Sequence, residues 1–197
     1  MEYIFLFSGQ GSQFKGMAED ICKAYPAARA VVDEMSSITG EDIAELLWHT
    51  EKEELSRSDK SQLVITAVEC AVLAVLKDKG ITPSAAAGFS LGEFPALYAS
   101  GVLDFESTVR IVQKRGRIMQ KSCEEIAVSS EGKPCGMAAV IRLEAEKISE
   151  LLAPYSNPET GSVFAANMNS PAQTVVSGTA EGLDTAEALC KEAGAKR

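Results

Sequence analysis

Short apolar runs alternate with longer amphipathic segments along the first two thirds of the chain. Residues 3–7 and 85–88 are such runs, and their bounds of polar, proline or glycine residues are typical of buried parallel strands. Apolar side chains then recur at helical spacing, which predicts helices over 17–35, 43–48, 62–79 and 105–122, and a further helix starting near Pro95. This alternation of strands and helices indicates an α/β sheet.

The pattern changes after the polar stretch 129–134, Ser-Ser-Glu-Gly-Lys-Pro, which is typical of a linker. Beyond it, we expect strands over 137–141, 163–167 and 173–177 and helices over 144–153 and 180–193. A ferredoxin-like split βαβ unit has this order of elements followed by one more strand. The sequence therefore predicts two parts, 1–128 and 135–197, and we expect the last strand of the second part to be missing.

Composition excludes several classes of protein. The 197 residues carry a formal net charge of −9, which argues against nucleic acid as a partner, because phosphate binding needs a cationic surface. The five cysteines form no C-x-x-C pair, so we expect free thiols and no metal site. The N-terminus does not have the pattern of a signal peptide, and no apolar stretch approaches the length of a membrane span. We therefore expect a cytoplasmic protein that has no membrane partner.

A candidate nucleophile lies directly after the second predicted strand. Gly88-Phe89-Ser90-Leu91-Gly92 fits the pattern G-x-S-x-G, in which a sharp turn between a strand and a helix exposes a serine hydroxyl. The crowding in such a turn requires residues without side chains two positions before and two positions after the serine. Free N–H groups at the start of the helix can then hold a developing oxyanion. The alternative is an ordinary tight turn.

A second glycine-containing loop follows the first predicted strand. Gly9-Gln10-Gly11 lies at the edge of the sheet where parallel strands end, and such loops gather ligands. The loop could thus offer a second backbone N–H to an oxyanion. A phosphate-binding loop is the competing interpretation, but Phe14 occupies the position of the third glycine of G-x-G-x-x-G.

Arg115 is the one cation of its predicted helix that points inward. At the helical period it falls between two groups of apolar residues, one of which contains Ile111 and Ile118. A buried arginine must be paired, either in an internal salt bridge or with the carboxylate of a substrate, which its planar fork suits. The helix's other cations cluster on the opposite side, where they form a solvated face or steer an acidic carrier protein: Arg110, Lys114, Arg117 and Lys121.

Taken together, these motifs resemble those of the malonyl-CoA:acyl-carrier-protein transacylase family of bacterial fatty-acid synthesis. The matching stretches run from end to end: 7–13, 16–17, 61–62, 88–93, 115–116, 119–120, 137–139, 167–171, 173 and 177–178. The resemblance implies an α/β-hydrolase-like parallel-sheet subdomain with an inserted ferredoxin-like α+β subdomain, and we expect both to be incomplete at the C-terminus. It also implies that malonyl passes from malonyl-CoA to a serine and then to the phosphopantetheine thiol of acyl carrier protein, with no cofactor.

The resemblance assigns roles to individual residues. Ser90 matches the nucleophile, and the backbone N–H groups of Gln10 and Leu91 match the oxyanion hole. Arg115 matches the residue that pairs with the malonyl carboxylate. The remaining matches are polar residues near the pocket: Gln62, Asn167 and Gln173.

This chain departs from the family's pattern at three places. Phe89 replaces a histidine beside the acyl group, and Ser8 replaces a common proline. The family's catalytic histidine has no counterpart here, because the only histidine, His49, lies outside every motif and is expected to be structural or exposed. Losing the base of a serine–histidine pair lowers kcat on the order of 10⁶-fold, so we expect these 197 residues alone to be nearly inactive.

Three functions therefore remain open. The first is a malonyl transacylase represented by an incomplete chain. The second is a non-catalytic fragment of the same family that binds acyl-CoA or the carrier protein. The third is another serine acyl enzyme such as an esterase, which the sequence disfavours because an esterase has no need of Arg115.

Overall fold

A computed structural model describes residues 2–129 and 135–196, which form two compact units, Met1–Lys121 and Ser122–Arg197. The first unit contains parallel strands and the second contains antiparallel strands, so the fold is a mixed α/β fold. Most of the expected linker lies outside the described residues. Ser129, its first residue, is instead the last residue of a helix.

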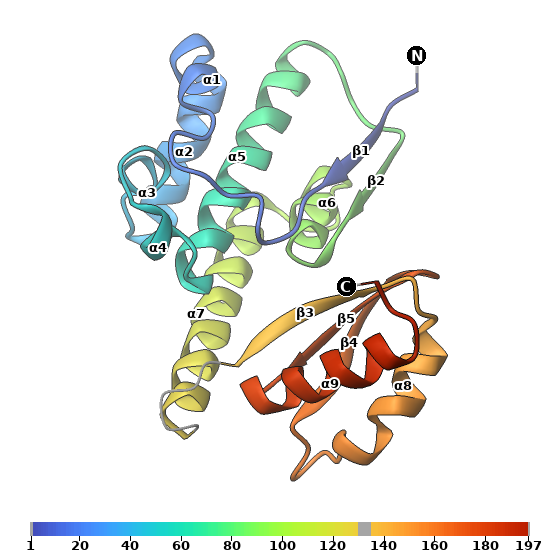
Figure 1. The fold of residues 1–197 in the computed structure, drawn as a ribbon. Coiled ribbons are helices and arrows are strands. Elements are labelled where there is room, and N and C mark those ends of the chain that lie inside the picture. The colour runs from blue at the N-terminus through green and yellow to red at the C-terminus, as the bar shows by residue number, and fades with distance from the viewer. Residues whose placement is uncertain (1, 130–134, 197) are drawn as a thin grey trace. The chain divides into compact units, whose positions relative to one another are not determined.

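The two strands of the first unit pair in parallel. β1 (Ile4–Phe7) lies beside β2 (Ala85–Gly88), with Ile4 opposite Ala85 and Phe7 opposite Gly88. Both strands were predicted, and the chain between them crosses over through five helices (Figure 1). Because the strands are parallel, both end at the same edge of the sheet, and the loops that follow them start side by side.

The helices between β1 and β2 differ from the prediction at three places. The predicted helix 17–35 is wrong, because the chain forms α1 (Glu19–Ala24) and α2 (Pro26–Thr39). Tyr25 separates them in an extended conformation, since the residue before a proline avoids the helical region. A short α4 (Lys52–Leu55) was not expected, and α5 (Ser58–Asp78) starts four residues before the predicted helix; α3 (Ile43–Trp48) is as predicted.

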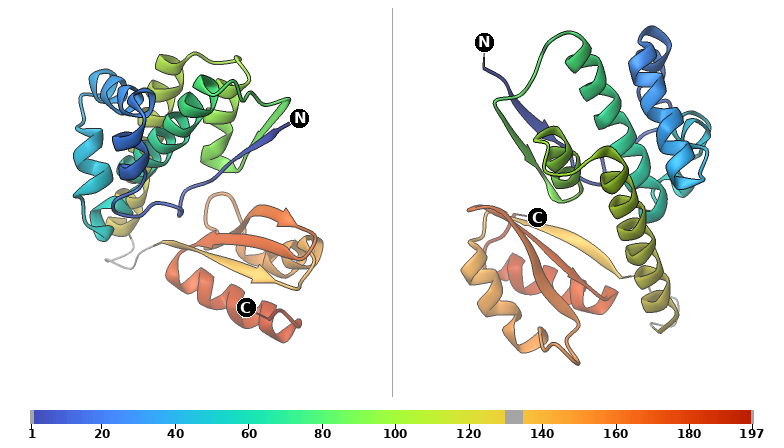
Figure 2. Two further views of the ribbon diagram at one scale, coloured as in Figure 1. Left: turned by 90° about the horizontal axis from the view of Figure 1, so that it is seen from above. Right: turned by 180° about the vertical axis from the view of Figure 1, so that it is seen from behind.

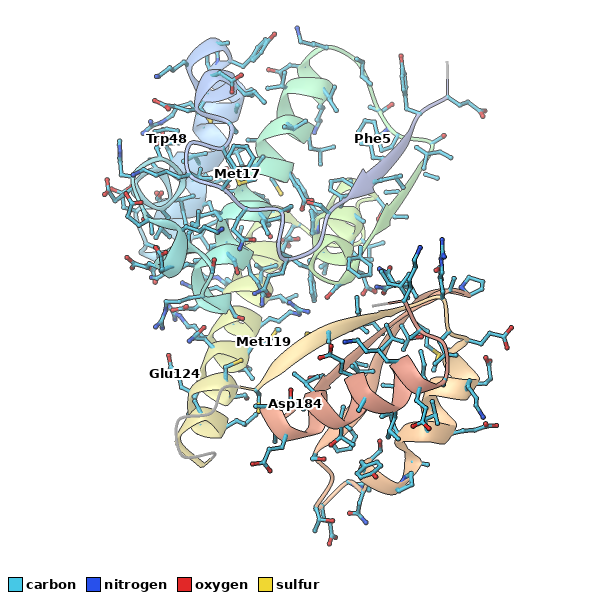
Figure 3. The ribbon with its side chains drawn as sticks, viewed as in Figure 1. Phe5, Met17, Trp48, Met119, Glu124 and Asp184 are labelled. Carbon is cyan, nitrogen blue, oxygen red and sulfur yellow. The ribbon has the colours of Figure 1, made fainter. Side chains whose placement is uncertain are left out.

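The core of the first unit lies between α2, α3 and α5. Its largest fully buried side chains include Met35, Ile43, Leu47 and Leu63. Trp48 packs against this core and donates its indole N–H to the carbonyl of Met17 over 3.3 Å (Figure 3). The core therefore fixes α5, the helix that also contacts both loops at the end of the sheet.

A short 3₁₀ helix, η1, and two α-helices follow β2. η1 (Ser90–Gly92) continues directly into α6 (Glu93–Ala99), and α7 (Phe105–Ser129) runs seven residues beyond its predicted end. Ile111 and Ile118, which were placed on the apolar side of α7, are exposed. Helical periodicity says which residues share a face, but it does not say that another element covers that face.

The second unit is a three-stranded antiparallel sheet with both of its helices on one face (Figures 1 and 2). β5 (Gln173–Gly178) lies between β3 (Gly136–Ile141) and β4 (Val163–Ser170). α8 (Ala145–Leu152) and α9 (Ala180–Glu192) enclose a core with Val140, Val163 and Val176; η2 (Ala153–Tyr155) follows α8. All five expected elements are confirmed, although β4 extends three residues further.

None of the helices in the described part of the chain is long and apolar enough to cross a membrane.

Candidate active site

Ser90 lies on a sharp turn between β2 and the helical segment that follows, as the G-x-S-x-G pattern predicts. β2 ends at Gly88, and η1 begins at Ser90 itself. Ser90 has φ 53°, a left-handed conformation that is unfavourable for a residue with a side chain. The side chain is exposed. A strained, exposed serine held by the surrounding structure is typical of a functional site.

Packing explains both glycines of the turn. A Cβ atom at Gly88 would lie 2.0 Å from the carbonyl group of Gly92, and a Cβ atom at Gly92 would lie 2.4 Å from the Phe7 carbonyl oxygen. Those neighbours are backbone atoms of the turn and of β1, so they cannot rotate away as a side chain would. The turn therefore depends on glycine at both positions.

Arg115 of α7 reaches the hydroxyl of Ser90. Its Nη2 donates a hydrogen bond to Ser90 Oγ over 3.2 Å, and its Nη1 donates to Gln62 Oε1 over 2.6 Å. The guanidinium also lies 5.8 Å from the centre of the Phe94 ring. No carboxylate among the described residues pairs with Arg115, so the alternative of an internal salt bridge finds no partner in this part of the chain.

Gln62 connects Arg115 to the loop after β1. Its side chain is fully buried, and its Nε2 lies 3.3 Å from Gln10 Oε1 and 3.2 Å from Met119 Sδ. Gln10 in turn donates from Nε2 to Ser58 Oγ over 3.2 Å. One polar network therefore joins the Gln10 loop, the start of α5, Arg115 and Ser90.

Close packing of α7 on α5 makes this network possible. A Cβ atom at Gly116 would lie 2.8 Å from the carbonyl oxygen of Ser58, so glycine allows the two helices to approach here. The neighbouring Arg115 can then reach Gln62 within hydrogen-bond distance. The helical pattern predicted the inward direction of Arg115, and this contact confirms it.

The loop after β1 lies against the turn that contains Ser90. Phe89 donates its N–H to the Phe7 carbonyl over 3.0 Å, and a Cβ atom at Gly9 would lie 2.7 Å from the Phe89 ring. Gln10 hydrogen-bonds other described residues through its side chain only, which leaves its backbone N–H available within that part of the chain. Leu91 lies in the first turn of a helical segment, where backbone N–H groups lack helical acceptors.

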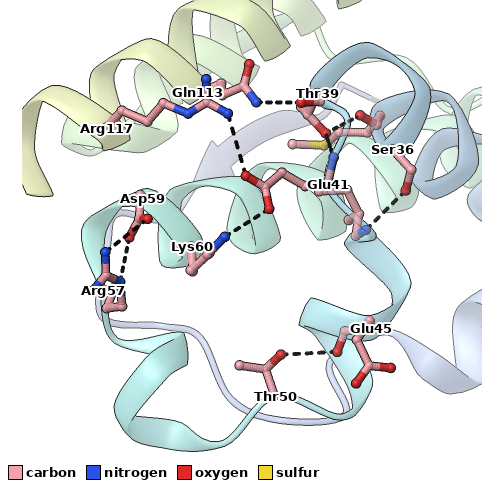
Figure 4. Close-up of polar contacts among 12 residues, drawn as sticks. Ser36, Thr39, Glu41, Glu45, Thr50, Arg57, Asp59, Lys60, Gln113 and Arg117 are labelled. Atoms are coloured by element: carbon pink, nitrogen blue, oxygen red, sulfur yellow. Dashed lines mark hydrogen bonds and ion pairs between the residues drawn. The ribbon is translucent and has the colours of Figure 1, made fainter.

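The outward cations of α7 are partly neutralised by carboxylates of this unit. Arg110 pairs with Glu106 over 2.7 Å, and Arg117 lies 3.5 Å from Glu41, which also pairs with Lys60 (Figure 4). Ion pairs of this kind fit the expectation of a solvated face. The alternative, that these cations steer a carrier protein, stays a prediction.

The remaining residues singled out from the sequence lie elsewhere. Asn167 is on β4 and Gln173 begins β5, both in the second unit, and neither side chain hydrogen-bonds a described residue. Phe89 is 51% exposed beside Ser90. His49 follows α3, and no hydrogen bond joins it to Ser90, for which Arg115 is the recorded side-chain partner among the described residues.

Sequence reasoning missed Ser58 and Phe94. Ser58 lies one turn before Gln62 on α5 and so shares a helix face with it. Phe94 lies in the first turn of α6, directly after the segment that begins at Ser90. Ser58 lies outside the expected helix, which starts at Gln62. The described residues contain no cluster of side chains that could hold a metal ion.

Comparison with known proteins identifies the family. The family model described as "Acyl transferase domain" matches residues 4–197. The malonyl CoA-acyl carrier protein transacylase of Bacillus subtilis is 39% identical over 193 residues, which cover 98% of this chain and 58% of that protein. The chain thus spans about three fifths of the length of such relatives.

Two solved structures have the same fold as this chain. The malonyl CoA-acyl carrier protein transacylase of Coxiella burnetii has a TM-score of 0.87 at 32% identity, covering 100% of this chain and 60% of that one. A malonyl-transacylase solved in complex with its type II polyketide-synthase acyl-carrier protein has a TM-score of 0.86 at 36% identity, covering 100% of this chain and 61% of that one. The chain belongs to the acyl transferase domain family, and its relatives there include the malonyl CoA-acyl carrier protein transacylases of Bacillus subtilis and Escherichia coli.

Proposed function

We propose that this chain carries the nucleophile and the carboxylate-binding residue of an acyltransferase that moves malonyl from coenzyme A to acyl carrier protein in fatty-acid synthesis. The observation that supports this most strongly is the contact between Arg115 Nη2 and Ser90 Oγ, 3.2 Å, made by a guanidinium with no carboxylate partner among the described residues. A nucleophile that forms an acyl-enzyme and a cation that binds the acyl group's free carboxylate must lie this close, because malonyl is only three carbons long.

Ser90 attacks the thioester carbonyl carbon of malonyl-CoA. The carbonyl oxygen becomes an oxyanion, and the backbone N–H groups of Gln10 and Leu91 stabilise it. The carbon–sulfur bond then breaks, the malonyl group stays on Ser90 Oγ, and coenzyme A leaves as a thiol with the serine's proton. In the second half, the phosphopantetheine thiol of acyl carrier protein attacks the ester and takes the malonyl group, which returns the proton to Ser90.

Arg115 selects an acyl group that ends in a carboxylate. Gln62 occupies one N–H of Nη1, which leaves the Nη2 and Nε donors for the malonyl carboxylate. The substrate carboxylate displaces Ser90 Oγ from Nη2, which frees the hydroxyl for attack. Phe89, Asn167 and Gln173 are proposed to line the acyl pocket.

A base must accept the proton of Ser90. The contact with Arg115 leaves the Ser90 hydroxyl proton free, because the guanidinium donates and the oxygen accepts. No described histidine or carboxylate hydrogen-bonds this hydroxyl, and His49 is the only histidine of the 197 residues. We therefore expect slow acylation by this chain alone, and the same observation favours the alternative function of binding acyl-CoA or the carrier protein without turnover.

Two features of the strands support the subdomain assignment. Ile4 and Leu6 of β1 are 67% and 79% exposed, although strands in parallel sheets are normally covered on both faces. This open face supports 1–128 as part of an α/β-hydrolase-like subdomain. In the second unit, Lys196 donates its N–H to the Ile141 carbonyl over 3.0 Å along the edge of β3. A backbone bond of this kind beside β3 supports a ferredoxin-like order for 135–197.

Intact-protein mass spectrometry tests the proposal. The chain is incubated with malonyl-CoA, with and without added imidazole as an external base, and Ser90→Ala serves as the matched control. We expect the mass of one malonyl group on Ser90, formed faster with imidazole and absent in the variant. Labelling that survives Ser90→Ala refutes Ser90 as the nucleophile. Saturable binding of malonyl-CoA without any covalent label supports the alternative function, binding without turnover.

A further inference from the structure

Glu69 contacts the loop after β1 at a point the active-site network does not use. Its Oε1 accepts a hydrogen bond from the Ser8 N–H over 2.6 Å and another from the Ser8 hydroxyl over 2.9 Å. Ser8 Oγ also lies 3.1 Å from Ser12 Oγ, and Ser12 donates to the Gly9 carbonyl over 3.2 Å. Glu69 therefore accepts hydrogen bonds from Ser8, the first residue of the Ser8–Ser12 loop.

Three residues on one face of α5 hold this loop. Ser58, Gln62 and Glu69 follow one another at intervals of four and seven, the spacing of a single helix face. Ser58 and Gln62 bind the Gln10 side chain, and Glu69 binds Ser8 two residues earlier. The loop is therefore attached to the same helix at two points, Ser8 and the Gln10 side chain.

We propose that Glu69 is a positioning residue that fixes the Ser8–Ser12 loop, and with it the backbone N–H of Gln10, by accepting both hydrogen bonds from Ser8. The proposal rests on the proposed function, in which that N–H stabilises the oxyanion. An oxyanion donor contributes only when it is held in place before the charge develops. Fixing the start of the loop supplies that constraint.

The environment of Glu69 is costly for a residue with only a structural role. Its second oxygen, Oε2, is buried and has no hydrogen-bond partner among the described residues. Leaving a buried polar atom without a partner destabilises a fold. A glutamine would accept from Ser8 without a buried charge, so a carboxylate at this place is better explained by stronger bonds to the loop.

Charge on Glu69 changes near neutral pH. Burial raises the pKa of Glu69 to about 7, while the two bonds from Ser8 act in the opposite direction. The neighbouring titratable group on α5 is Cys70, whose pKa is raised by burial and by the charge of Glu69. The next is Tyr98 of α6, whose pKa is raised by burial and by the charge of Cys70. No described charged side chain pairs with Glu69. Its bonds to Ser8 therefore strengthen as the pH rises through about 7 and the carboxylate forms.

Nuclear magnetic resonance of the full chain tests the anchor without requiring acyl transfer. We expect the Ser8 and Gln10 amide signals to shift with pH around an inflection near 7, as the Glu69 carboxyl ionises. In Glu69→Gln this inflection disappears, while Glu53→Gln, which removes an exposed carboxyl of α4, leaves it unchanged. A Gln10 amide whose titration is the same in Glu69→Gln and in the original chain overturns the proposal.

The rate of Ser90 acylation provides a second test of the role of Glu69. We expect Glu69→Gln to slow labelling of Ser90 by about tenfold to a hundredfold, as for a small misplacement of a catalytic group, and to remove the rise in rate around pH 7. An unchanged rate and pH profile overturns the positioning role. If the original chain forms no acyl-enzyme while its Gln10 amide titrates through Glu69, the anchor is supported and the proposed acyl transfer is refuted, so the two failures are distinguishable.

Discussion

Replacing Gln62 by leucine removes the residue that joins Arg115 to the Gln10 loop. The two side chains have similar volumes, so the substitution changes polar contacts at a fully buried position and leaves no large cavity. Arg115 loses the acceptor 2.6 Å from its Nη1, and Gln10 loses the donor 3.3 Å from its Oε1. Both groups then have to find water or remain without partners.

The expected cost follows from these two bonds. A hydrogen bond to a charged group contributes about 1.5–3 kcal/mol and a neutral one about 1 kcal/mol. The apolar leucine offsets part of this loss, because it needs no partner in the core. We therefore expect Gln62→Leu to lower the free energy of unfolding of the first unit by about 2–3 kcal/mol. Acylation of Ser90 should fall as well, since Arg115 is no longer held.

Urea unfolding followed by tryptophan fluorescence measures this cost in the first unit alone. Trp48 is the only tryptophan of the chain, and it packs against the core of that unit. Its emission therefore reports unfolding around α5 without interference from the second unit. The midpoint and slope of the transition give the free energy of unfolding.

Thr66→Val is the matched control, one turn further along α5. Thr66 is fully buried and its hydroxyl has no hydrogen-bond partner among the described residues, so we expect the valine variant to be as stable or about 1 kcal/mol more stable. Equal stability changes in Gln62→Leu and Thr66→Val would refute the network, because the polar partners of Gln62 would then contribute nothing.

Substitutions at three other positions test the turn and the buried carboxyl by the same unfolding assay. Ser90→Gly should be about 0.5–1 kcal/mol more stable than Ser90→Ala, because relief of the left-handed strain exceeds the entropy cost of glycine; the reverse order contradicts the strain at φ 53°. Gly88→Ala should destabilise the first unit by more than about 4 kcal/mol, since its Cβ would lie 2.0 Å from Gly92, and wild-type stability would contradict the packing. Glu69, whose pKa is raised to about 7, binds a proton more tightly in the folded state, so stability should fall as the pH rises from about 4.5 to 7; Glu69→Gln should flatten this slope, and an equal slope in both proteins contradicts the assignment.

Local patterns predicted the turn and the direction of Arg115 because the causes are local. The glycines at 88 and 92 are required by contacts within the turn and with the adjacent strand, and the inward direction of Arg115 follows from its place on one helix. The break before Pro26 also had a local cause, but the apolar periodicity across 17–35 concealed it.

Contacts between distant residues left no pattern in the sequence. Ser8 and Glu69 are separated by 61 positions, and Gln10 and Gln62 by 52, so only the parallel pairing of β1 and β2 with α5 beside them brings these groups together. The second unit illustrates the same limit. Its element order was predictable, whereas the sheet order β3-β5-β4 depends on pairing across the whole unit.

We propose that Arg115, which lies beside Ser90, binds the carboxylate of the acyl group. The most direct test of this proposal is the ratio of Ser90 labelling rates with malonyl-CoA and acetyl-CoA, measured in the original chain and in Arg115→Ala. We predict that the variant loses malonyl labelling by about tenfold to a hundredfold, the value of a charged hydrogen bond of 1.5–3 kcal/mol, and keeps acetyl labelling. Equal losses with both thioesters would contradict the account.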